Sequence, residues 1–79
     1  MPYINQKRRE EIYSGSRPET AGELNFVITL AICDYLDHPA YGELNEVIGV
    51  LESVKLEFCR RVVFPYEDTK LAQNGDVYK

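Results

Sequence analysis

The chain has 79 residues, a formal net charge of -4 and a pI of about 4.9. This length predicts one domain, and the acidic balance argues against general nucleic-acid binding, which needs a basic face. A domain this small has a marginal core of its own, and Cys33, Cys59 and the single histidine His38 are too few for a disulfide framework or a structural zinc site. We therefore expect assembly into a homo-oligomer, with no cofactor and no metal.

The start of the chain carries no sign of a targeting segment. Met1-Pro2-Tyr3-Ile4 leads directly into polar residues, and no apolar run approaches the roughly 20 residues that a membrane helix needs. We expect a cytoplasmic protein without a membrane partner.

The first expected element is a short helix from Gln6 to Tyr13, with Asn5 as its N-cap and Gly15 beyond its end. Three basic residues and two acidic ones follow one another within it, at Lys7, Arg8, Arg9, Glu10 and Glu11. This mixture predicts a helix face in water. Alternatively, the basic cluster packs near Arg60 and Arg61 and makes one positive pocket with them.

A second helix is expected after Thr20 and runs to about Leu36. Thr20 and Glu23 have the spacing of a capping box, in which the hydroxyl accepts from the Glu23 amide and the carboxylate from the Thr20 amide. No charge occurs between Leu24 and Cys33. A helix that is apolar nearly all round is buried on more than one side.

The third helix is expected from about Tyr41 to Phe64, after a connection in which Pro39 takes the first helical position and Asp37 or His38 lies near the cap. Its main apolar face comprises Leu44, Val47, Ile48, Leu51, Val54, Phe58 and Val62. Gly49, Leu56, Cys59 and Val63 lie on another side. The short connection predicts an antiparallel hairpin of the second and third helices.

Pro65 is expected to break or kink this helix and to push Phe64 out of the helical region, and it can also serve as the first residue of a new turn. A short polar helix follows from Tyr66 to Gln73 and stops at Asn74-Gly75. The sequence thus predicts an all-α fold with a single domain over 1–79: an N-terminal segment at 1–19, a helical hairpin at 20–64, and a C-terminal helix and tail at 65–79.

A short stretch occurs twice in the chain. Gly22-Glu23-Leu24-Asn25-Phe26-Val27-Ile28 returns twenty residues later as Gly42-Glu43-Leu44-Asn45-Glu46-Val47-Ile48, with six identities in seven positions. One interpretation is two similar helices with the same start, packed with approximate twofold symmetry. The other is chance combined with common helix-start chemistry. Asn25 and Asn45 are then either exposed or capping amides, or a paired amide contact across the hairpin or a subunit interface.

The chain resembles a family of small proteins of tailed phages and bacteria that has no established activity. The resemblance covers most of the chain. It is carried by Met1-Pro2-Tyr3-Ile4, by Gly22-Glu23-Leu24-Asn25 with Ile28, by Asn45-Glu46-Val47-Ile48-Gly49, Lys55-Leu56-Glu57 and Arg60-Arg61-Val62-Val63, and by Pro65-Tyr66-Glu67-Asp68 and Asn74-Gly75-Asp76-Val77-Tyr78. The resemblance implies a phage or bacterial origin. By analogy alone, small phage proteins suggest counter-defence, in which some oligomers sequester nucleotide signals.

The segment around Pro65 is the best candidate for a binding site. Arg60 and Arg61 suit phosphate oxygens, and Tyr66 could stack on a base or ribose. The alternative is that the two arginines only form helix salt bridges with Glu57 and complement the helix dipole. No combination of residues predicts a nucleophile, an acid–base pair or a phosphate-binding glycine loop, so we expect no enzyme.

We therefore expect a non-enzymatic protein that binds a small anionic, nucleotide-like ligand through Arg60, Arg61, Tyr66, Asn45 and Asn25. The alternative is an interaction module, or an inhibitor, that binds a host protein through its apolar helix faces. For the homo-oligomer we expect contacts at Phe26, Gly49, Leu56 and Cys59.

Overall fold

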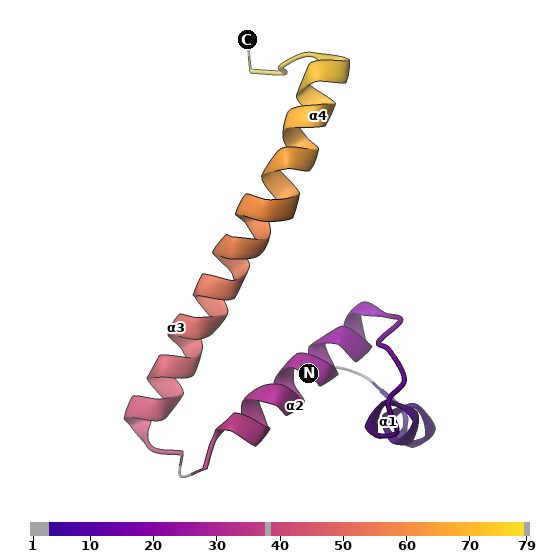
Figure 1. Cartoon of the computed structure of the whole chain (residues 1–79), viewed down its shortest axis with the longest axis vertical. Coiled ribbons are helices and arrows are strands. Elements are labelled where there is room, and N and C mark those ends of the chain that lie inside the picture. Colours follow the sequence, from indigo (N-terminus) through magenta and orange to yellow (C-terminus); the bar gives the residue numbers. More distant parts are fainter. Residues whose placement is uncertain (1–3, 38, 79) are drawn as a thin grey trace. The chain divides into compact units, whose positions relative to one another are not determined.

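The computed structural model describes residues 4–37 and 39–78, and every regular element in this part of the chain is a helix (Figure 1). The all-α prediction is confirmed. The chain divides into two compact units, residues 1–39 and 40–79, each of which is described by itself. The predicted antiparallel packing of the second helix on the third stays a prediction.

The first unit begins with α1 (Gln6–Tyr13), which has the predicted bounds. The side chain of Asn5 caps the helix, because its Oδ1 accepts the backbone N–H of Arg8 at 2.8 Å. The chain leaves the helix through Gly15, whose φ of 110° lies in the left-handed region that favours glycine. Both predicted ends of α1 are therefore confirmed.

Helix α2 (Ala21–Tyr35) follows a loop. The Thr20 hydroxyl accepts the N–H of Glu23 at 3.1 Å, which confirms the predicted N-cap. The other half of the capping box is displaced by one residue, because the Glu23 carboxylate accepts the N–H of Glu19 at 2.9 Å and not that of Thr20. The helix ends one residue before the predicted limit, since Leu36 is extended with ψ 119°.

An aromatic contact joins the two helices of the first unit. The ring of Tyr13 from α1 meets the ring of Phe26 from α2 edge to face, with 5.8 Å between centroids and 74° between planes. Phe26, which we expected at a subunit contact, thus packs within its own unit.

The second unit is one uninterrupted run of helix, made of α3 (Tyr41–Phe58), a π-helical turn η1 (Cys59–Val63) and α4 (Phe64–Asn74) (Figure 1). Helix α3 begins at Tyr41 with Ala40 in the cap position, where no side chain caps it. The expectations of a cap at Asp37 and of a helical Pro39 were therefore wrong, and His38, the other candidate cap, lies outside the described residues.

The predicted break at Pro65 was also wrong. Phe64 is helical, with φ -66° and ψ -44°, and Pro65 lies in the first turn of α4. The π turn explains this, because the N–H of Phe64 reaches back five residues to the carbonyl of Cys59. Pro65 has no N–H to donate, and the wider turn in front of it removes the clash that an unbroken α-helix would create.

Helix α4 ends at Asn74, one residue after the predicted end at Gln73, and Gly75 follows it. Gly75 has φ 86° and donates its N–H to the carbonyl of Leu71 at 2.8 Å. The chain then turns at Asp76, whose carboxylate accepts the N–H of Tyr78 at 2.8 Å. This turn brings the C-terminal residues beside α4 within the second unit.

The repeated stretches occupy equivalent places in the two units. Gly22 is the second residue of α2 and Gly42 is the second residue of α3, so both copies of the repeat open a helix. Only the first copy is preceded by a side chain that caps. The shared sequence therefore marks a shared helix start.

Candidate functional site

The predicted arginine pair lies on the π turn of the second unit. Arg60 and Arg61 both reach the carboxylate of Glu57 one turn earlier, Arg60 through Nη2 at 3.6 Å and Arg61 through Nε in a closer contact. Their side chains are 70% and 67% exposed. The helix salt bridges that we considered as the alternative interpretation are therefore present. They leave most donors of both guanidinium groups open to solvent.

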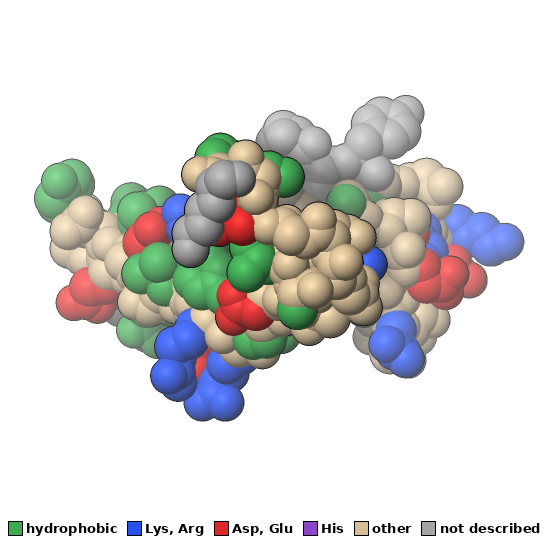
Figure 2. Space-filling model, turned by 90° about the horizontal axis from the view of Figure 1, so that it is seen from above, with side chains coloured by type: hydrophobic (Ala, Val, Ile, Leu, Met, Phe, Trp, Pro, Cys, Tyr) green, Lys and Arg blue, Asp and Glu red, His purple; other side chains and the backbone are tan. Residues whose placement is uncertain are grey.

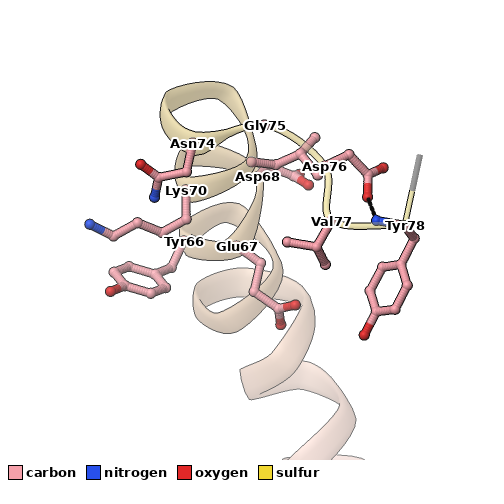
Figure 3. Close-up of a pocket in the computed structure, with 10 residues that line it drawn as sticks. Tyr66, Glu67, Asp68, Lys70, Asn74, Gly75, Asp76, Val77 and Tyr78 are labelled. Carbon is pink, nitrogen blue, oxygen red and sulfur yellow. Dashed lines mark hydrogen bonds between the residues drawn. The ribbon is translucent and has the colours of Figure 1, made fainter.

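Tyr66 lies on α4 and turns its ring toward Lys70, whose Nζ is 5.6 Å from the ring centroid. The pair borders a concavity of about 550 Å³ between α4 and the C-terminal turn (Figure 3). In Figure 3 Tyr66 and Lys70 point to one side of α4, while Val77 and Tyr78 lie on the other. Neither Arg60 nor Arg61 lines this concavity.

The lining of the concavity is acidic. Among the described residues that line it, Glu67, Asp68 and Asp76 contribute three carboxylates, against the ammonium group of Lys70. Such a lining disfavours a phosphate and favours a cation. Sequence reasoning missed Lys70, Asp76 and Tyr78 as members of one surface. The signal that could have found them is the Asn74-Gly75 stop, after which the chain must turn.

The two asparagines belong to different units. Asn25 lies on α2 and its Oδ1 accepts the hydroxyl of Thr29 at 3.2 Å. Asn45 lies in the second turn of α3, where its side chain is exposed. Of the five residues predicted to bind a ligand, Arg60 and Arg61 share an acidic partner, and Tyr66 faces Lys70.

The basic cluster of α1 differs from the expected solvated face at its central residue. The guanidinium group of Arg8, only 17% exposed, binds Glu23 at 2.9 Å, Glu19 at 3.3 Å and Glu11 at 3.6 Å. It also donates to the carbonyl of Arg17 at 2.6 Å. A planar fork with five donors suits this many acceptors, so Arg8 ties α1 to the loop and the start of α2.

The two central charges of this network stabilise each other's ionised form. The hydrogen bond from the N–H of Glu19 is the main cause that lowers the pKa of Glu23; burial opposes it, and the hydrogen bond and charge of Arg8 lower the pKa further. The hydrogen bond to Glu23 raises the pKa of Arg8. The network is a structural link within the first unit, since its acceptors already occupy the guanidinium group.

The long helix is the continuous run of α3, η1 and α4 from Tyr41 to Asn74. Its main apolar face is largely exposed to solvent. Val54, Phe58 and Val62 are 57%, 56% and 51% exposed, and Val47 is the only residue classed as buried in the described part of the chain. Figure 2 shows hydrophobic side chains at the surface, beside those of lysine and arginine. The face is therefore an apolar stripe along a helix that is open to solvent.

Within residues 4–37 and 39–78, no group of three His, Cys, Asp or Glu side chains could hold a metal ion. In the same part of the chain no helix has the length and apolar character to cross a membrane.

The search for curated proteins and solved structures similar to this chain found no match. A family profile described as a domain of unknown function, DUF6899, matches residues 1–77, nearly the whole length. The chain therefore belongs to the DUF6899 family.

Proposed function

We propose that this protein is a non-enzymatic interaction module that binds another protein through the main apolar face of its long helix. The observation that supports this most is the exposure of that face, where Val54, Phe58 and Val62 each leave more than half of their surface in water. A lone helix in water is marginal, because most helical stability in proteins comes from packing an apolar face. A partner supplies that packing.

The length of the helix supports the same conclusion. The run from Tyr41 to Asn74 extends for about 50 Å at 1.5 Å per residue. Helix α2 has 15 residues and therefore spans only about 22 Å. Even a fully formed hairpin could cover less than half of the long helix, so its second half needs a partner from outside the chain.

The spacing of the face suits packing against a helix. Leu44, Val47, Leu51, Val54 and Phe58 alternate in steps of three and four residues, as the apolar positions of coiled coils do. After Phe58 a further step of three would place Arg61 on the face. The π turn inserts one extra residue there, so Val62 takes that position and the face continues.

Covering the exposed apolar face would stabilise a complex. Full burial of a valine, leucine or phenylalanine side chain contributes about 1.5–3 kcal/mol. Because Val54, Phe58 and Val62 are each about half exposed, covering these three contributes roughly 2–4 kcal/mol, and Leu44, Ile48 and Leu51 add to this. Association must also offset lost rotational and translational freedom, so we expect moderate affinity.

A photo-activatable side chain tests the proposal. Placed at Val54, on the main apolar face, it should crosslink one defined protein in the cells that make this chain. Placed at the neighbouring Ser53, which is turned by about 100° around the helix, it should not. Equal labelling from both positions, or labelling of many unrelated proteins, would contradict a specific interaction through this face.

The second candidate function is binding of a small anionic, nucleotide-like ligand, as in sequestration of a nucleotide signal by a phage counter-defence protein. The observation that favours it is the π turn, because such turns occur often at functional sites and this one carries Arg60 and Arg61. Calorimetric titration with cyclic dinucleotides and ADP-ribose tests this. Arg60→Ala or Arg61→Ala should weaken binding about ten- to a hundredfold, whereas Lys7→Ala should change little.

A further inference from the structure

We propose that two copies of this chain pair antiparallel through a second surface of the long helix, centred on Phe64. This surface, the Phe64 face, consists of Arg60, Arg61, Phe64, Glu67, Asp68 and Leu71. In the proposed pair, Arg60 and Arg61 of each copy meet Glu67 and Asp68 of the other. The inference concerns a side of the helix that the proposed interaction through the main apolar face does not use.

Helical spacing places these residues together. Phe64, Glu67, Asp68 and Leu71 follow the i, i+3, i+4, i+7 pattern of one helix face. Across the π turn that the Phe64 N–H closes on Cys59, a step of four residues returns to nearly the same side of the helix, so Arg60 lies on the Phe64 side and Arg61 lies at its edge. Val62 and Tyr66 lie two residues from Phe64, about 200° around the helix, and therefore on the opposite side.

Along the sequence, the charges are arranged symmetrically about Phe64. Arg60 and Arg61 lie four and three residues before it, and Glu67 and Asp68 lie three and four residues after it. When the face meets a copy of itself in the antiparallel sense, each arginine pair comes opposite a carboxylate pair. A parallel arrangement would instead bring like charges together, which is unfavourable.

The surroundings of the two charge pairs complement each other as well. Glu67 and Asp68 line the acidic concavity beside the C-terminal turn, together with Asp76. An arginine fork is the donor that suits such carboxylates. On the other side, the guanidinium groups of Arg60 and Arg61 are about two-thirds exposed, and in the described part of the chain their ion-pair partner is the Glu57 carboxylate.

Phe64 lies between the charges, and Leu71 lies about one turn beyond the carboxylates. Phe64 is 54% exposed and Leu71 is 48% exposed, so both can be covered on pairing. At the twofold axis the two Phe64 rings would meet. An interface between identical chains must be self-complementary, with residue i against j and j against i. The order basic, aromatic, acidic along this face has that property, which favours a second copy over an unrelated partner.

Charge reversal with complementation tests the proposed pair in the full chain. The acidic variant is Arg60→Glu/Arg61→Glu, and the basic variant is Glu67→Arg/Asp68→Arg. By sedimentation equilibrium, wild-type protein should give twice the chain mass of 9.1 kDa. Each variant alone should dissociate, with its dimer constant weakened about a hundredfold or more by facing like charges. An equimolar mixture of the two should recover the dimer mass.

The control is Lys7→Glu/Arg9→Glu, which changes the net charge as much as the acidic variant but lies on α1, and it should leave the dimer intact. Circular dichroism of each variant reports its helix content. A monomeric wild-type protein, a single variant that stays dimeric, or a mixture of helical variants that stays monomeric would each overturn the proposal. None of these results concerns the main apolar face, so the proposed function is tested separately.

Discussion

Replacing Thr20 by alanine should destabilise the start of α2 by a predictable amount. The Thr20 hydroxyl accepts the N–H of Glu23 at 3.1 Å, and this bond satisfies one of the donors that the first turn leaves unpaired. The Glu23 carboxylate keeps its own bond to the N–H of Glu19 in the variant. Only half of the displaced capping box is lost, so we expect a cost of about 1 kcal/mol.

Thermal unfolding followed by circular dichroism measures this cost. For a domain of this size, about 1 kcal/mol lowers the melting temperature by roughly 4–8 °C. Thr20→Ser keeps a hydroxyl at the cap and should restore most of the loss, which separates capping from other effects of the substitution. A Thr20→Ala protein that melts with the wild type, or a serine variant as unstable as the alanine variant, would refute this assignment.

The remaining predictions concern four other positions. Because the pKa of Glu23 is lowered, its contribution to stability is complete above the usual glutamate value of 4.5 and is lost as the pH falls through the lowered pKa. In the Glu23→Gln variant, the melting temperature should therefore depend less on pH in that acid range than it does in the wild type. Gly49→Ala should stabilise the helix by about 1 kcal/mol in urea unfolding, because an added Cβ meets nothing within 4 Å; a loss would indicate a close approach at Gly49 in the assembled protein. Gly75→Ala should destabilise α4 by about 1 kcal/mol, since its φ of 86° strains any residue with a side chain, and unchanged unfolding would contradict this. Arg61→Ala should cost about 1 kcal/mol or less in the same assay, as an exposed ion pair does, and a larger loss would mean that Arg61 has a further contact.

Local chemistry made much of the fold predictable from the sequence. Asn5, Thr20 and Gly75 each act through a hydrogen bond or a φ value within a few residues of themselves, and each lies where its residue type indicated. The error at Pro65 has an equally local cause. A proline destabilises an α-helix through a steric clash and a missing N–H donor, but a π turn before the proline removes the clash. No residue type predicts such a turn.

The candidate site was less predictable, because it depends on which side chains meet across turns. Lys7, Arg8 and Arg9 are all basic and adjacent in the sequence. In the described part of the chain, Arg8 is the one that forms ion pairs with Glu19 and Glu23 across the loop. The acidic concavity likewise depends on the turn after Gly75. Periodicity predicts the faces of helices, whereas contacts of this kind follow from the path of the chain between them.

Calorimetric titration of the crosslinked partner tests the central claim most directly. The partner captured from Val54 would be purified and titrated with wild-type protein and with Val54→Glu/Phe58→Glu, in which two carboxylates replace exposed members of the main apolar face. We predict specific binding by the wild type and at least about a hundredfold weaker binding by the variant, since burying an unpaired charge costs several kcal/mol. Equal affinity of the two proteins for that partner would contradict an interaction through this face.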